Sequence, residues 1–132
     1  MKEPYWLNKE MVLAIHGELL ARFGGMAGIR DEGMLESALN RPIHVFHYGE
    51  PTSLAVLAAA YTASLVGNHP FLDGNKRIGF MAAYTFPGIN GLSLTVPEEQ
   101  AVLMTRGLAA GEIGEAAYGQ WLEDGTTPRE GS

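Results

Sequence analysis

The chain has 132 residues, a length typical of a single domain with a substantial hydrophobic core. Apolar residues make up 46% and charged residues 18%, which excludes a disordered chain. There is no cysteine, so disulfides, thiolate catalysis and zinc sites built on sulfur are excluded. The net charge of -6 disfavours direct contact with nucleic acid, because such binding depends on neutralising phosphates.

The sequence contains no segment that resembles a membrane span. Its longest uncharged stretch, residues 51–72, includes Pro51, Gly67, Pro70 and several polar residues. The first six residues lack the apolar run and cleavage site of a secretion signal. We therefore expect a cytoplasmic protein with no membrane partner.

Hydrophobic residues recur at helical spacing from the N-terminus onward. Asn8 is a plausible N-cap for a first helix ending at Gly24, and Asp31 for a second helix ending before Pro42. Residues 42–51, bounded by two prolines, are expected to form an extended loop or a short pair of strands. Residues 52–67 carry an apolar stripe among alanines, which is typical of the central helix of a bundle.

The second half of the chain continues this pattern. A helix over residues 76–86 is expected to end at Pro87, and residues 92–96 to be extended. Thr95 and Glu98 have the spacing of a capping box, which predicts a helix to about residue 110.

A last helix is expected over residues 113–124, followed by a frayed tail over 125–132. The fold predicted is all-α, a compact helical bundle with a short extended flap. We expect residues 1–132 to form a single domain whose core spans about 6–124.

The candidate chemistry is concentrated between the third and fourth predicted helices, in residues 68–77. A helix N-terminus leaves backbone N–H groups unpaired, so the start of the fourth helix suits an anion. Gly74 permits close approach of the backbone, and Asn75 and Arg77 can donate hydrogen bonds to phosphate oxygens. Lys76 adds a further cation. Asp73 can supply an oxygen ligand to Mg²⁺.

His69 lies at the mouth of the same loop. An imidazole can take up a proton near neutral pH, so His69 is the candidate general base. Pro70 fixes the backbone after it, and Phe71 is expected to anchor the loop in the core. Taken singly, a loop histidine or an Asp-Gly-Asn turn is most often structural; the functional interpretation depends on their occurrence together.

These residues resemble the Fic/Doc superfamily, whose signature is His-x-Phe-x-Asp/Glu-Gly-Asn-Gly-Arg followed by a further Arg. Lys76 and Phe80 stand where the adenylylating members have Gly and the second Arg, and both departures are typical of the death-on-curing (Doc) branch. The resemblance extends over roughly residues 6–124. The signature positions matched are His69, Phe71, Asp73, Gly74, Asn75 and Arg77.

The resemblance implies a helical Fic core and the toxin of a two-gene toxin–antitoxin module. It implies a protein kinase that transfers the γ-phosphate of ATP, with Mg²⁺, to a threonine hydroxyl of elongation factor Tu and so blocks translation. It also implies restraint by a cognate antitoxin with a Phd-like C-terminal segment that folds on binding.

Two alternatives remain open. Gly74 belongs to the adenylylating pattern, so transfer of AMP to a protein hydroxyl is the second reading of the same loop. The third is a catalytically inactive module that binds the antitoxin. The intact loop argues against this third alternative, because an inactive site would be expected to have lost at least one of His69, Asp73, Asn75 and Arg77.

The resemblance also suggests roles outside the loop. Residues 42–51 correspond to the flap that presents the target segment, with Ile43, His44, Val45, Phe46 and His47 expected to bind it through the backbone. His44 and His47 lack an obvious third metal ligand, and His16 is interpreted as structural or surface-exposed. Thr126, Glu130 and Gly131 match the letters of an inhibitory helix, but Pro128 makes a helix there improbable, so we treat the match as coincidence.

Overall fold

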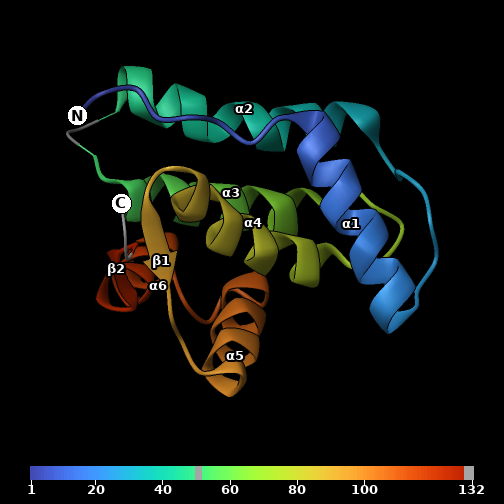
Figure 1. Ribbon diagram of the computed structural model, residues 1–132. Helices are drawn as coiled ribbons and strands as arrows, with labels where there is room; N and C mark the ends of the chain where they lie inside the picture. The colour runs from blue at the N-terminus through green and yellow to red at the C-terminus, as the bar shows by residue number, and fades with distance from the viewer. Residues whose placement is uncertain (50–51, 130–132) are drawn as a thin grey trace.

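The computed structural model describes residues 1–49 and 52–129. Within them the chain forms mainly helices, joined by one small antiparallel sheet (Figure 1). In chain order the elements are α1 (Lys9–Phe23), α2 (Glu32–Tyr48), α3 (Leu54–Asn68), α4 (Asn75–Ile89), β1 (Leu92–Leu94), α5 (Glu98–Ala109), α6 (Glu115–Asp124) and β2 (Thr126–Pro128). The predicted all-α bundle is confirmed, with the two short strands added.

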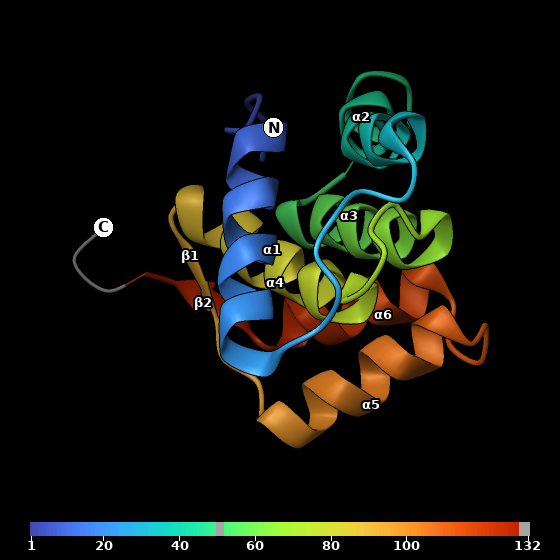
Figure 2. The ribbon, with the colours of Figure 1, turned by 90° about the vertical axis from the view of Figure 1, so that its right-hand side faces the viewer.

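Helix α3 lies at the centre of the bundle. Helix α2 packs on one side of it, and α4 and α6 on the other (Figures 1 and 2). Ten of its 15 residues are buried, because it has neighbours on nearly every side. The central position of this helix was predicted. More of its surface is buried than the amphipathic pattern of its sequence predicts.

The close packing of α3 on α4 depends on Gly79. A Cβ added there would lie 2.8 Å from Cγ1 of Val66 on α3, too close for any real side chain. The Thr62 hydroxyl donates a hydrogen bond of 2.8 Å to the Gly79 carbonyl across the same contact. The bare backbone of α4 therefore rests directly on α3, which fixes the two helices that carry the loop between them.

The predicted helix starts agree with the structure. Asn8 accepts a hydrogen bond from Met11 N at the start of α1, and Asp31 accepts one from Met34 N at the start of α2. Ser53 caps α3 in the same way, through a bond from Val56 N. Short polar side chains thus satisfy N–H groups that the first turn leaves without partners.

Both prolines predicted to end helices lie inside them. Helix α2 continues through Pro42 to Tyr48, and α4 continues through Pro87 to Ile89. Proline removes one hydrogen-bond donor and crowds the preceding turn, yet Pro42 and Pro87 are buried, and packing of the residues beyond them compensates. Phe46, for example, meets the Trp6 ring edge-on at 5.7 Å.

The predicted capping box at Thr95 is also wrong, because α5 starts at Glu98 with Pro97 as its N-cap. The Thr95 backbone N–H instead donates to the Gly125 carbonyl at 2.8 Å, where the chain returns from α6. Residues 126–128 are not frayed as expected: they form β2, which pairs antiparallel with β1 and matches Leu92 with Pro128. The signal missed was the partner strand, which lies more than 30 residues away in the sequence.

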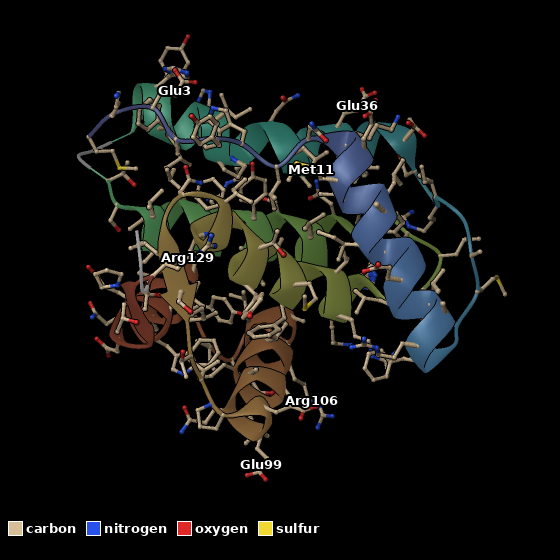
Figure 3. The ribbon with its side chains drawn as sticks, viewed as in Figure 1. Glu3, Met11, Glu36, Glu99, Arg106 and Arg129 are labelled. Carbon is tan, nitrogen blue, oxygen red and sulfur yellow. The ribbon has the colours of Figure 1, made fainter. Side chains whose placement is uncertain are left out.

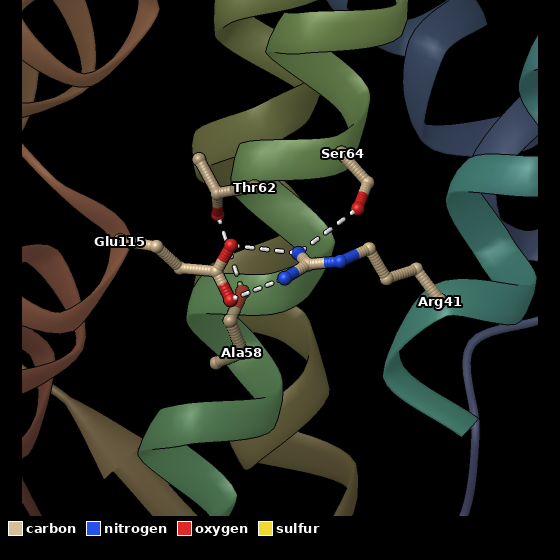
Figure 4. Close-up of polar contacts among 5 residues, drawn as sticks. All are labelled: Arg41, Ala58, Thr62, Ser64 and Glu115. Atoms are coloured by element: carbon tan, nitrogen blue, oxygen red, sulfur yellow. Dashed lines mark hydrogen bonds and ion pairs between the residues drawn. The ribbon is translucent and has the colours of Figure 1, made fainter. Parts of the chain in front are cut away.

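An ion pair joins three helices. Arg41 on α2 donates to both carboxylate oxygens of Glu115 at the start of α6, at 2.7 and 3.1 Å (Figure 4). It also donates to the Ser64 hydroxyl of α3 at 3.4 Å. This contact ties α2 to α6 across the face of α3.

The N-terminal segment runs along α2, with Glu3 near the end of that helix (Figures 1 and 3). Glu3 accepts a hydrogen bond of 2.8 Å from the Trp6 indole and lies 3.8 Å from His47. Further along, the Leu7 backbone N–H donates to the Tyr61 hydroxyl at 3.0 Å, and that hydroxyl donates to the Leu7 carbonyl at 3.3 Å. Burial raises the pKa of Tyr61 to about 12, so the phenol is neutral when it makes these bonds.

We expect Tyr61→Phe to lower the free energy of unfolding by about 1–3 kcal/mol, because both backbone groups of buried Leu7 would lose their partner. Urea denaturation monitored by circular dichroism measures this loss. Tyr84→Phe is the matched control, since Tyr84 is 49% exposed on α4 and should change stability little. Equal effects of the two substitutions would contradict the role given to the Tyr61 hydroxyl.

Candidate active site

The loop of residues 69–74 joins α3 to α4 at the end of the bundle crossed by α1 (Figures 1 and 2). A second segment, residues 24–31, runs beside it, and we call this segment the brace. Ile29 and Phe71 form an antiparallel bridge, and Leu72 N donates to the Gly28 carbonyl at 3.0 Å. The Pro70 carbonyl accepts from the backbone N–H groups of Arg30 and Asp31, at 2.7 and 3.1 Å. The loop is thus held by a strand-like pairing about 40 residues distant in the sequence.

His69 occupies an unusual backbone position. It follows the last residue of α3 with φ 50° and ψ 53°, and among the described residues it is the one non-glycine residue with a positive φ. A side chain in this left-handed conformation costs roughly 1–2 kcal/mol. Its imidazole is exposed, as a group that meets a substrate must be.

Asn75 fastens the loop from inside. Its side chain is 7% exposed; its carbonyl oxygen accepts from Phe71 N, and its amide nitrogen donates to Phe71 O, both at 3.0 Å. These two partners fix which end of the amide is oxygen and which is nitrogen. If Asn75 is to donate a hydrogen bond to a phosphate oxygen, as predicted, its amide nitrogen must give up one of its present hydrogen-bond partners.

The same amide constrains the proton on His69. The Asn75 amide nitrogen lies 3.3 Å from Nδ1 of His69, and because that amide nitrogen is a donor, Nδ1 must accept. A neutral His69 ring in this arrangement carries its hydrogen on Nε2. The ring can take a proton from a hydroxyl only if its 3.3 Å contact with Asn75 gives way, since the nitrogen that is free of hydrogen faces the amide.

Asp73 is exposed, and the loop orients its carboxylate. Oδ1 accepts from Gly74 N at 2.9 Å, and Oδ2 accepts from Met26 N of the brace at 3.2 Å. A Cβ at Gly25 would lie 2.9 Å from Oδ2, so the glycine leaves room for this carboxylate. Each oxygen keeps lone pairs for a hard cation.

The donor chemistry at Asp73 fits Mg²⁺ in one particular way. Within the described residues there is no group of three or more His, Cys, Asp or Glu side chains that could hold a metal ion. Mg²⁺ is commonly bound by one or two carboxylates together with the phosphates of a substrate. Asp73 can therefore contribute one ligand to such an ion where phosphate groups supply others.

The start of α4 is open to an anion. Gly74, with φ 78°, is its N-cap, and no described side chain caps the helix. A Cβ at Gly74 would lie 3.4 Å from Nε2 of His16. Lys76 and Arg77 are exposed in the first turn, and the Arg77 guanidinium stacks on the Phe23 ring, 4.6 Å from its centroid.

Two residues support the loop through contacts that the sequence analysis did not predict. His16 on α1 is buried, stacks on Phe71 with ring centroids 3.8 Å apart, and bonds through Nε2 to the Asp73 carbonyl at 2.8 Å. A carbonyl only accepts, so His16 Nε2 is the donor. Of the two interpretations offered for His16, structural and surface-exposed, the structure supports the first. Phe71 anchors the loop in the core, as predicted. Arg30 is the other contributor, and its side-chain bonds have no local sequence signal.

Comparison with known proteins identifies the family. The family model described as Fic/DOC family matches residues 6–87, which contain α1 to α3, the loop and most of α4. The chain belongs to the Fic/Doc family. The predicted resemblance is confirmed, and the loop of residues 69–74 lies within the matched region.

Two curated relatives of this Fic/Doc chain carry Doc names. "Protein kinase doc" of Escherichia phage P1 is 32% identical over 116 residues, which cover 88% of this chain and 91% of the relative. "Toxin Doc" of Mycolicibacterium smegmatis is 44% identical over 90 residues, which cover 67% of each chain.

The predicted flap of this Fic/Doc protein does not have the extended conformation expected. Ile43, His44, Val45, Phe46 and His47 lie in the last turns of α2, whose backbone N–H and C=O groups are largely used within the helix. They are also remote from His69. Asn68 bonds to the Met34 carbonyl at 3.0 Å, and Ile43 lies a further nine residues along α2, roughly 14 Å at the helical rise. The predicted extended conformation is therefore wrong for residues 42–48, whereas target binding by Ile43 to His47 stays a prediction; residues 50 and 51 lie outside the described part.

Two further expectations concern the whole Fic/Doc chain. Thr126, part of the supposed inhibitory pattern, lies in β2, whereas Glu130 and Gly131 lie outside the described residues. Within the described residues, no helix is both long and apolar enough to cross a bilayer. The cytoplasmic location stays a prediction.

We expect Asn75→Asp to destabilise the protein by about 1–3 kcal/mol, because an acceptor would replace the donor that faces Phe71 O and His69 Nδ1. A buried carboxylate has a raised pKa, so the loss should grow as the pH rises through about 4 and beyond. Urea denaturation at pH 4 and pH 7 measures it. Asn40→Asp, at an exposed position on α2, is the control. A loss no larger than that of Asn40→Asp would contradict the donor role assigned to the Asn75 amide nitrogen.

Proposed function

We propose that this protein is a protein kinase that acts as the toxin of a toxin–antitoxin module. It transfers the γ-phosphate of ATP to a threonine hydroxyl of a target protein, by resemblance elongation factor Tu, and so blocks translation. The observation that carries this proposal is the meeting of His69, Asp73 and the open start of α4 at one loop. The name of the phage P1 relative, which aligns with 88% of this chain, supports the kinase reading.

The proposed reaction needs a base, an anion site and a leaving group. The hydroxyl oxygen attacks the γ-phosphorus, the bond to the β,γ-bridging oxygen breaks, and ADP leaves with that oxygen. The hydroxyl proton passes to the His69 ring nitrogen released from Asn75. Because phosphoryl transfer proceeds through a loose transition state, most of the catalysis is positioning and charge stabilisation.

The protein's own groups divide this work. Backbone N–H groups in the first turn of α4 and the positive end of its dipole face the phosphates. Arg77, steadied by its stack on Phe23, balances charge on the transferring group. Mg²⁺, held at Asp73 together with the nucleotide, would neutralise negative charge on the phosphates.

A small antitoxin is the proposed restraint. The name "Toxin Doc" of the Mycolicibacterium relative supports a toxin function for this chain. A toxin encoded beside its antitoxin is controlled by binding, and a partner segment that folds on binding suits that role. The Phd-like character of the segment rests on the resemblance alone.

A second candidate function, transfer of AMP, is favoured by Gly74. At this position a glycine with φ 78° brings bare backbone to the anion site, as the adenylylating pattern does. In that reaction the same hydroxyl attacks the α-phosphorus, and pyrophosphate leaves. Lys76 argues for the kinase, because its side chain occupies the position that adenylylating members leave open.

We expect purified protein to transfer label to elongation factor Tu from ATP labelled at the γ-phosphate and not from ATP labelled at the α-phosphate. His69→Ala should abolish this transfer, whereas Gln120→Ala, at an exposed position on α6, should retain it. Label from the α position would favour AMP transfer. Growth arrest on expression that persists in His69→Ala would favour the inactive binding module.

We expect Lys76→Gly to lower γ-phosphate transfer by at least about tenfold and to allow transfer from the α position, because it removes the side chain held to set the nucleotide's orientation. Lys76→Arg keeps the charge and should keep γ-phosphate transfer. The ratio of labels transferred measures the orientation. An unchanged ratio in Lys76→Gly would show that Lys76 does not choose between the two reactions.

A further inference from the structure

We infer that Arg30 is a positioning residue for His69, an inference that rests on the proposed base role of that histidine. Arg30 lies in the brace and contacts no reacting atom. Its Nε donates to the His69 carbonyl at 2.6 Å, and its terminal nitrogen donates to the Asn68 carbonyl at 2.8 Å. One planar guanidinium thus holds two consecutive carbonyls, those of the last residue of α3 and of its C-cap.

These carbonyls need a partner from elsewhere. The last carbonyls of a helix have no intrahelical partner and carry its negative dipole end. The last turn of α3 contains no basic residue of its own, and the structure gives no backbone N–H bond from the C-cap position. A left-handed C-cap is usually glycine or asparagine, but His69 occupies it here. Arg30 therefore supplies both the charge and the geometry that the helix end lacks.

Both sides of His69 are fixed by the same short stretch of the brace. Pro70 disfavours right-handed helical geometry for the residue before it, which agrees with the end of α3 at Asn68 and the left-handed backbone of His69. The Pro70 carbonyl is bound by the backbone of Arg30 and Asp31, while the Arg30 side chain binds the carbonyl of His69. The backbone held in this way sets the direction of the Cα–Cβ bond of His69, and so the point from which the imidazole extends.

The alternative role for Arg30 is a plain helix cap, and charge distinguishes the two. A lysine at position 30 would keep the cation near the end of α3 but would place its donors on one nitrogen, not on two nitrogens in a fixed plane. If Arg30 only neutralises the dipole, Arg30→Lys should match the wild type both in stability and in the placement of His69. If Arg30 instead fixes the positions of the two carbonyls, Arg30→Lys should keep the stability of the wild type but not the placement of His69.

The test combines kinetics with a readout that does not need activity. The sequence has only four histidines, so long-range ¹H–¹⁵N spectra of the imidazoles can be assigned with His→Ala variants. In Arg30→Lys and Arg30→Met we expect the His69 nitrogen signals to shift or double, while those of buried His16 stay in place. We expect kcat to fall by about tenfold to a hundredfold, with KM for ATP changed less than about twofold.

Arg41→Lys is the matched control, because Arg41 also binds two oxygens through a guanidinium but at the α2–α6 contact. It should leave the His69 signals and kcat unchanged. His69 signals that are unchanged in both Arg30 variants would overturn the inference, as would full activity of Arg30→Lys. If wild type shows no transfer from either labelled phosphate, the proposed function fails, and the spectra still decide whether Arg30 places His69.

Discussion

The pairing of the brace with the loop of residues 69–74 is the contact on which the candidate site depends. It joins the turn after α1 to the connection between α3 and α4, and it is anchored by Phe71, which is 1% exposed beneath the His16 ring. Without it, a loop of six residues between two helices would have many accessible conformations, and ordering them would cost backbone entropy. Because the pairing is made in the folded protein itself, the His69 imidazole, the Asp73 carboxylate and the start of α4 are already arranged before any ligand binds.

Most polar side chains of the loop and of the start of α4 form hydrogen bonds that fix the conformation of the loop. Asn75 uses its amide on Phe71 and His69, and the Asp73 carboxylate accepts from Gly74 and Met26. A signature residue can therefore be required for two reasons, to shape the loop and to touch the substrate. Substitution at such a position lowers activity under either reason, which is why stability and activity have to be measured on the same variant.

The sequence predicts this fold where the signal is local. Asn8 and Asp31 cap the helices expected of them, and the alanine-rich central helix lies where its pattern places it. The failures share a cause, which is that tertiary packing overrides a local rule. Pro42 is tolerated inside α2 because the residues beyond it pack on the core, and the end of the chain becomes β2 because β1 offers it a partner. The extended conformation expected after Pro42 was wrong for the first of these reasons, since it depended on a helix ending at Pro42.

The candidate site shows the same division between near and distant information. The types and spacing of His69, Asp73 and Lys76 are visible in ten consecutive residues, and they suffice to suggest phosphate chemistry. The orientation of those groups is set from elsewhere, because the backbone at His69 is held by a guanidinium 39 residues away and the Asp73 carboxylate by a backbone N–H 47 residues away. A motif therefore specifies which atoms can react, whereas the brace determines whether they face the same point. That difference explains how a loop could keep every signature residue and still lose its chemistry through a change in residues 24–31.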